Sequence, residues 1–126
     1  MTHITISEVG PRDGLQSVDT ILSTEGKLAW IETEYGAGVR EIEVGSFVSP
    51  KLLPQMADTA AVVKGALRHQ DLVIAVLVPN LRGCEAALEA GAHKISIPLS
   101  LSETHSIKNV RRDHAQMLEE ISACQA

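Results

Sequence analysis

Aromatic side chains are almost missing from this sequence. Its 126 residues include one Trp, one Tyr and one Phe, and aromatic residues make up 2% of the chain. A core without large rings has to be assembled from Ile, Val, Leu and Ala. An aliphatic core of this kind is typical of parallel strands buried beneath helices.

An excess of basic charge is also lacking. The chain carries 11 Lys and Arg against 16 Asp and Glu, and its formal net charge is -5. A nucleic-acid-binding protein needs a basic face that displaces counterions from the phosphates. The charge balance therefore excludes nucleic acid as a partner.

Membrane and cysteine signals are sparse. No apolar run approaches the ~20 residues that span a bilayer, and the first residues lack the basic-then-apolar order of a signal peptide. Cys84 and Cys124 lie far apart and form no Cys-x-x-Cys pattern, so neither a zinc site nor a disulfide framework follows. We expect no membrane partner and a cytoplasmic location.

Apolar periodicity predicts strands that alternate with helices along the whole chain. Such an order favours a parallel sheet with right-handed crossovers. Two architectures fit it: an open doubly wound sheet, and four of the eight units of a barrel. The predicted strands are residues 4–9, 39–45, 72–78 and 93–97. The first predicted helix has Ser23 or Thr24 as its cap and Gly36 or Gly38 as its stop, and the others are residues 56–69, 81–90 and 109–123, with Asn80 capping and Gly91 ending the third.

Polar residues gather where the predicted strands end. Ligands of parallel α/β proteins bind beyond the carboxyl ends of the strands, so these residues are the candidates for a site. Arg12, Asp13 and Gln16 follow the first strand, Glu43 and Ser46 end the second, Asn80 follows the third, and Asn109 comes after the fourth.

Arg12, Asp13 and Glu43 have the most specific chemistry of this set. A carboxylate such as Asp13 suits a hard divalent cation, and a guanidinium can stabilise an oxygen on which negative charge develops. An inward carboxylate on a barrel strand needs a partner, and Arg12 is the nearest cation for Glu43. Simpler interpretations stay open: Pro-Arg-Asp-Gly as a turn, Glu43 on a solvated edge strand, and Asn80 as a helix cap.

Four ordered motifs resemble those of hydroxymethylglutaryl-CoA lyases, a branch of the DRE-TIM metallolyase superfamily. The Gly-Pro before Arg12 and the Ser-Phe-Val-Ser-Pro after Glu43 favour this branch over the acyl-transferring synthases that share Arg-Asp-Gly-x-Gln. The motifs are Glu-Val-Gly-Pro-Arg-Asp-Gly-Leu-Gln at 8–16, Ile-Glu-Val-Gly-Ser-Phe-Val-Ser-Pro-Lys at 42–51 with Pro-Gln-Met at 54–56, Val-Pro-Asn-Leu-Arg-Gly at 78–83, and Ser-Glu-Thr-His-Ser at 102–106 with Asn109.

The resemblance implies a parallel (β/α)4 portion of a TIM (β/α)8 barrel. It also implies cleavage of an acyl-CoA substrate, hydroxymethylglutaryl-CoA, to acetyl-CoA and acetoacetate with Mg²⁺ or Mn²⁺. By position, Arg12 and Glu43 would be catalytic, with Glu43 orienting Arg12, and Asp13 would be a metal ligand. The substrate-binding residues would be Gln16, Ser46, Asn80 and Asn109.

The resemblance also shows what this sequence does not contain. The family's His-x-His metal pair, a later Asn ligand and a Gly-rich loop with a catalytic Cys belong to the second half of the barrel. We therefore expect residues 1–126 to be a truncated amino-terminal half that is not competent alone and that self-associates through exposed barrel edges. Two alternatives stay open: a half-barrel binding or assembly module without catalysis, and an acyl-CoA condensing synthase of the same superfamily.

Overall fold

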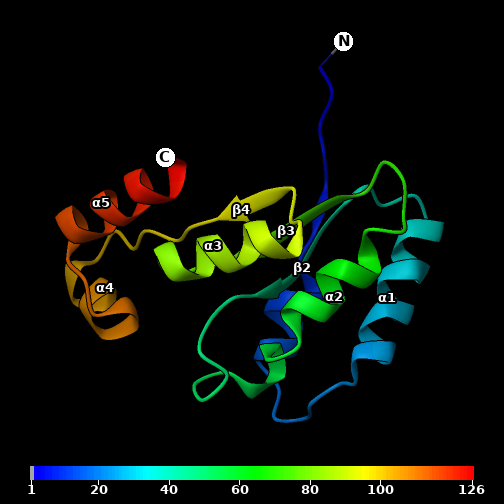
Figure 1. Cartoon of the computed structure of the whole chain (residues 1–126), viewed down its shortest axis with the longest axis horizontal. Coiled ribbons are helices and arrows are strands. Elements are labelled where there is room, and N and C mark those ends of the chain that lie inside the picture. Colours follow the sequence, from blue (N-terminus) through cyan, green and yellow to red (C-terminus); the bar gives the residue numbers. More distant parts are fainter. Residues whose placement is uncertain (1) are drawn as a thin grey trace.

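Four parallel strands form one sheet in the order β1-β2-β3-β4 (Figure 1). The computed structural model describes residues 2–126. A doubly wound sheet reverses its strand order at a switch point, whereas this order is sequential throughout, as in one portion of a barrel. The strands are β1 (Ser7–Glu8), β2 (Glu41–Ser46), β3 (Val73–Leu77) and β4 (Lys94–Ser96).

Among residues 2–126, five α-helices and two short helical turns connect and follow the strands. Their ends match local signals in the sequence: Ser23 and Asn80 accept backbone N–H groups as N-caps, and Gly91 ends α3 with a φ of 96°. The boundaries at Asn80 and Gly91 were predicted, and of the two candidate caps of the first helix the structure uses Ser23. The elements are η1 (Gly10–Gly14), α1 (Thr24–Gly36), η2 (Pro54–Met56), α2 (Thr59–Ala66), α3 (Leu81–Ala90), α4 (Glu103–Val110) and α5 (His114–Gln125).

The core lies between one face of the sheet and helices α1, α2 and α3. Ile42 on β2 and Ile74 on β3 have no exposed surface and meet Ile31 from α1 and Val63 from α2. It is aliphatic, as the composition indicates. None of the helices described in residues 2–126 is long and apolar enough to cross a membrane.

β1 is shorter than predicted. The alternation from residue 4 to residue 9 predicted a full strand, but only Ser7 and Glu8 pair with β2. Ser7 is opposite Glu41, the first residue of β2, so the preceding residues have no neighbouring strand to pair with. Residues 2–6 therefore project from the molecule (Figure 1).

The buried faces of α2 and α3 also differ from prediction. The apolar spacing of the sequence places Ala60, Val63 and Leu67 on one face of the second helix, and Leu81, Ala87 and Leu88 on one face of the third. Val63 and Ala87 are buried, but the other four residues are exposed. Small residues take their place because α3 approaches the sheet closely: a Cβ on Gly83 would lie 2.9 Å from the carbonyl oxygen of Phe47. A prediction from hydrophobic periodicity places large apolar residues in the core, so it does not identify a helix face that packs closely through small residues.

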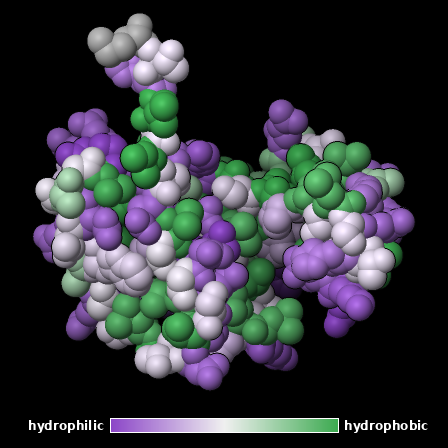
Figure 2. Space-filling model, turned by 180° about the vertical axis from the view of Figure 1, so that it is seen from behind, coloured by the Kyte–Doolittle hydropathy of each residue, from purple (hydrophilic) through white to green (hydrophobic). Residues whose placement is uncertain are grey.

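The single helix predicted over 109–123 was wrong. The structure has two helices, and Arg111 ends α4 with a left-handed φ of 57°. Asp113 then caps α5 in a reciprocal capping box with Gln116. In Figure 2 a hollow separates the lobe formed by α4 and α5 from the rest of the molecule.

Candidate functional site at the carboxyl ends of β1 and β2

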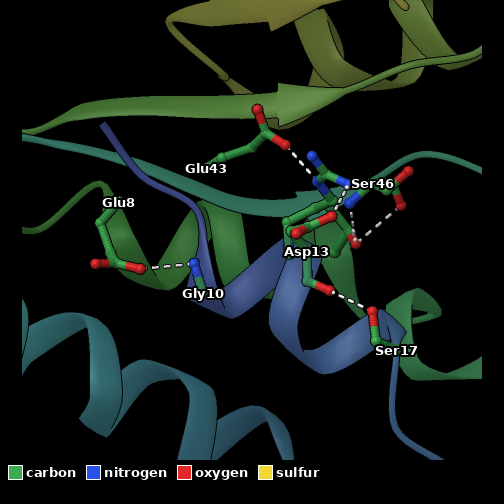
Figure 3. A network of polar contacts seen from close by, with 8 residues as sticks. Glu8, Gly10, Asp13, Ser17, Glu43 and Ser46 are labelled. Carbon is green, nitrogen blue, oxygen red and sulfur yellow. Dashed lines mark hydrogen bonds and ion pairs between the residues drawn. The ribbon is translucent and has the colours of Figure 1, made fainter. Parts of the chain in front are cut away.

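The motif after β1 folds into a single π-helical turn, η1, that carries Arg12 and Asp13. Glu8 fixes the beginning of this turn, because its Oε1 accepts the Gly10 N–H at 2.6 Å (Figure 3). Only glycine fits at position 10: a Cβ would lie 2.8 Å from Glu8 Oε1 and from the Trp30 ring. The Gly-Pro that precedes Arg12 therefore has a steric role in placing it.

Arg12 and Glu43 form an ion pair at the carboxyl end of the sheet. The Nε of Arg12 donates to Oε1 of Glu43, and both side chains are largely buried (Figure 3). β2 lies between β1 and β3, so Glu43 is not on a solvated edge strand. The pairing of Arg12 with Glu43, expected from the sequence, is confirmed. A buried charge without such a partner would cost several kcal/mol.

Asp13 lies next to the pair and faces solvent. Its side chain is 61% exposed, and Oδ1 accepts a hydrogen bond from Nη1 of Arg12 at 3.1 Å. Within residues 2–126, no group of three or more His, Cys, Asp and Glu side chains is arranged to hold a metal ion. These residues alone therefore do not fit a divalent cation, because a working site needs several ligands.

Ser46 reaches the same side of the sheet as Glu43 because β2 contains an irregularity. Glu43 pairs with Ala75, but Gly45 pairs with the next residue, Val76, so β2 holds one extra residue. A regular strand would place positions 43 and 46 on opposite faces. The extra residue brings them to one face, and Figure 3 shows Ser46, Glu43 and Asp13 together.

Gln16, Asn80 and Asn109 are less closely tied to this centre. Gln16 is half-buried just after η1. Oδ1 of Asn80 accepts the Gly83 N–H at 2.9 Å, so the capping interpretation is confirmed for this residue. Asn109 is exposed on α4, which stands away from η1 (Figure 1).

A cavity of about 450 Å³ opens beside the site, between the loop after β2 and the first turns of α2 and α3. Ser46, Asn80 and Arg82 are among its lining residues, whereas Arg12, Asp13 and Glu43 are not. The ion pair therefore belongs to the inner side of the sheet and the cavity to the helix side. Ser46 borders both.

Two lysines that the sequence analysis did not single out form ion pairs with carboxylates. Nζ of Lys94 lies 3.0 and 3.2 Å from the two carboxylate oxygens of Glu41. Lys27 is buried on α1, and its Nζ donates to Oδ1 of Asp58 at 2.5 Å. Lys27 precedes Ile31 by one helical turn, a spacing that indicates the core face of α1. The position of Lys94 depends on sheet register.

The fold and the site define a class of protein: a parallel (β/α)4 barrel portion with an arginine–carboxylate pair at the carboxyl ends of its strands. The model of the HMGL-like family matches residues 3–126. The chain belongs to this family, and the resemblance predicted from the four motifs is confirmed. It corresponds to the N-terminal portion of its relatives.

Individual relatives agree with this assignment. The chain is 44% identical over 115 residues to hydroxymethylglutaryl-CoA lyase of Bacillus subtilis, covering 91% of this chain and 38% of the relative. It is 50% identical over 108 residues to the mitochondrial hydroxymethylglutaryl-CoA lyase of Macaca fascicularis, covering 86% and 33%. The chain thus spans between a third and two-fifths of the length of these relatives.

Solved structures show the same relation in three dimensions. An HMG-CoA lyase from Acinetobacter baumannii, in complex with coenzyme A and 3-methylmalate, matches with a TM-score of 0.90 and 38% identity, over 98% of this chain and 42% of that chain. The B. subtilis HMG-CoA lyase matches with a TM-score of 0.90 and 41% identity, over 97% and 41%. The four-stranded sheet is therefore a portion of the barrel of these lyases.

Proposed function

We propose that this chain forms the amino-terminal half of a lyase barrel that cleaves 3-hydroxy-3-methylglutaryl-CoA to acetyl-CoA and acetoacetate. The observation that carries the proposal is the buried pair of Arg12 and Glu43 at the carboxyl ends of β1 and β2. This is the end of a parallel barrel at which substrates are converted. Relatives named for this reaction support it.

Arg12 has a definite task in this proposal. Cleavage transfers the proton of the substrate 3-hydroxyl to a base and breaks the bond between C2 and C3. The electron pair of that bond forms the enolate of acetyl-CoA, which then takes a proton at carbon. A guanidinium held in place by Glu43 stabilises the enolate oxygen without any rearrangement during the reaction.

The other residues of the site receive narrower roles. Asp13 would supply one ligand to Mg²⁺ or Mn²⁺, which would polarise substrate oxygens when the remaining ligands come from the second half of the barrel. Ser46 and Gln16 would contact the acyl group, and Asn109 on α4 a more distant part of the acyl-CoA. The coenzyme A bound to the A. baumannii lyase is consistent with an acyl-CoA substrate. We place the protein in the cytoplasm and expect a homo-oligomer.

The test is the substitution Arg12→Gln in the gene product that carries this sequence, expressed at its full length. We expect kcat to fall by about 100- to 1000-fold, the range for loss of one oxyanion donor. KM should change little, because the contact strengthens only in the transition state. Acetyl-CoA release from hydroxymethylglutaryl-CoA measures both constants.

Two further variants separate catalysis from folding. Arg12→Lys keeps a cation beside Glu43, so the fold is retained, but it loses the planar fork of donors and should still lower kcat. Arg68→Gln removes an exposed arginine that contacts Glu32 at 3.3 Å and His69 at 3.4 Å, and it should leave activity unchanged. An effect of Arg12→Gln on KM alone would remove Arg12 from the chemistry.

The same assay distinguishes the two other functions that the sequence left open. A condensing synthase would consume acetyl-CoA in the presence of a 2-oxo acid and would not cleave hydroxymethylglutaryl-CoA. A half-barrel binding module would do neither at any metal concentration. Either result would replace the proposed lyase function.

A further inference from the structure

We propose that Thr59 is a positioning residue for this site, because its hydroxyl holds the irregular end of β2 that turns the Ser46 hydroxyl toward Arg12 and Glu43. The inference rests on the proposed function. It adds a residue from the helix side of the sheet that does not itself touch the substrate.

The Thr59 hydroxyl contacts the backbone of both Ser46 and Met56. Oγ1 of Thr59 accepts the Ser46 N–H at 3.2 Å, and the carbonyl oxygens of Met56 and Ser46 lie within reach of its single proton, at 2.7 and 3.0 Å. Thr59 is 3% exposed. Because the extra residue in β2 disturbs the regular ladder, the Ser46 N–H takes a side-chain acceptor in place of a strand carbonyl.

Gly45 makes this contact possible. A Cβ at position 45 would lie 2.5 Å from Thr59 Oγ1 and 2.6 Å from its Cγ2, so only glycine lets the threonine reach the backbone of β2. The open side of Gly45 therefore faces α2. Adjacent strand residues project to opposite faces, so Ser46 projects to the inner face, where Glu43 lies.

The Ser46 hydroxyl is unsatisfied within the described part of the chain. Its Oγ is buried and has no hydrogen-bond partner among residues 2–126. Buried hydroxyls in folded proteins nearly always have a partner, and one without a partner at a site calls for a ligand. A carboxylate or carbonyl oxygen of the acyl group has the matching chemistry, since it accepts the hydroxyl proton.

The experiment is a double-mutant cycle in the full-length gene product. Ser46→Ala should raise KM for hydroxymethylglutaryl-CoA about tenfold with little change in kcat, the size expected for one lost hydrogen bond to a charged group. Thr59→Val, which keeps the shape but loses the hydroxyl, should raise KM about fivefold, and Thr59→Ser should restore it. In the Ser46→Ala background Thr59→Val should have no further effect on KM, because it acts through that hydroxyl.

A second measurement does not depend on activity. The Ser46 amide should exchange its hydrogen about tenfold faster in Thr59→Val than in the wild type or Thr59→Ser, because its acceptor is lost. Thr33→Val on α1 is the matched control: its hydroxyl also donates to a backbone carbonyl, that of Ala29 at 2.9 Å, but away from the sheet. It should change neither KM nor this exchange rate.

The outcomes separate this inference from the proposed function. A wild-type protein that cleaves hydroxymethylglutaryl-CoA, with an unchanged KM in Thr59→Val or with full additivity in the cycle, overturns the role of Thr59 alone. An inactive wild type that shows the expected change in exchange overturns the lyase function and leaves Thr59 as the holder of Ser46. An unchanged exchange rate overturns the inference in either case.

Discussion

Glu41 and Glu43 lie two residues apart on the inner side of β2, and each meets its own cation. Glu43 pairs with Arg12 from β1's side of the sheet, and Glu41 pairs with Lys94 from β4. The hydrogen bond from Lys94 is the main reason that the pKa of Glu41 lies below its ordinary value, against burial, which raises it. A lowered pKa stabilises the fold above the unfolded pKa, and this stability is lost as pH falls through the folded pKa.

Removal of Lys94 tests this pair. Lys94→Met should lower the free energy of unfolding at pH 7 by about 1 kcal/mol, a small effect because the lysine side chain is half exposed and screened by water. The difference from wild type should shrink as the pH falls through the lowered pKa of Glu41, where the carboxylate takes up a proton and loses its attraction to Lys94. Urea unfolding at pH 7 and pH 3 measures it.

Lys64→Met provides the comparison for Lys94→Met, since Lys64 is exposed on α2 and belongs to no ion pair described in residues 2–126. It should leave the free energy of unfolding nearly unchanged at both pH values. A Lys94→Met effect that persists undiminished at pH 3 would show that the lysine stem, and not its charge, stabilises the sheet.

Cys124 on α5 is a second residue with a shifted pKa. Burial, followed by its neighbour Cys84 on α3, raises the pKa of the Cys124 thiol to about 11. The thiolate is the reactive form, so at pH 8 iodoacetamide should modify Cys124 about a hundredfold more slowly than a free thiol. The rate, followed by intact mass, should rise steeply toward pH 11. Modification at pH 8 as fast as that of glutathione would contradict this environment.

At the scale of elements, boundaries set by local chemistry were predictable and those set by register were not. Ser23 and Asn80 begin helices and Gly91 ends one, each through contacts with residues at most four positions away. The local sequence therefore indicates these boundaries. The pairing of Arg12 with Glu43 was also predictable, because adjacent strand ends meet in any parallel sheet. The roles of Thr59 and Lys94 depend on one extra residue in β2 and on the alignment of β4, which no local pattern encodes.

The corner between α4 and α5 was missed although its signal was present. Asp113 followed three residues later by Gln116 is the pattern of a capping box, but the apolar periodicity of 109–123 runs through it. The sign of the change in the free energy of unfolding caused by Asp113→Ala distinguishes two helices from one continuous helix. With the corner it should cost about 1 kcal/mol through loss of the N-cap, whereas in a continuous helix alanine would stabilise the chain.

Chemical denaturation of Asp113→Ala and Asp113→Ser decides the matter. Serine retains a capping oxygen for the Gln116 N–H, which Asp113 Oδ1 accepts at 2.8 Å, so this variant should stay close to wild type. Stabilisation by alanine would contradict the two-helix arrangement.

At the scale of the whole molecule, the polar inner side agrees with the portion of a barrel that this chain matches. Helices α1, α2 and α3 cover one face of the sheet, while Glu41, Glu43 and Ser46 project to the other face, where η1 packs against β2 and these three residues are buried. In a complete barrel the same face lines a closed interior, and no strand has a free edge. In the proposed half-barrel, the same open arrangement leaves the site without its second half and leaves the outer strands without partners.

We expect the isolated 126-residue chain to self-associate through its sheet edges. The outer edge of β1 is unpaired, and the segment before it carries Ile4 and Ile6, 86% and 78% exposed. This apolar segment continues the line of the edge strand and offers a template for another strand, and a lysine placed on it blocks pairing. Sedimentation velocity of the wild-type chain should show larger species as concentration rises, and Ile6→Lys should shift the distribution toward monomer.

Leu52→Lys is the matched control for this change, because Leu52 is 80% exposed but lies in the loop after β2, away from both sheet edges. It adds the same charge and removes a comparable apolar side chain, so it should associate as the wild type does. If Leu52→Lys dissolved the larger species as well as Ile6→Lys, net charge and not strand pairing would govern association. A wild-type chain that stayed monomeric at every concentration would mean that its edges are protected without a second half of the barrel.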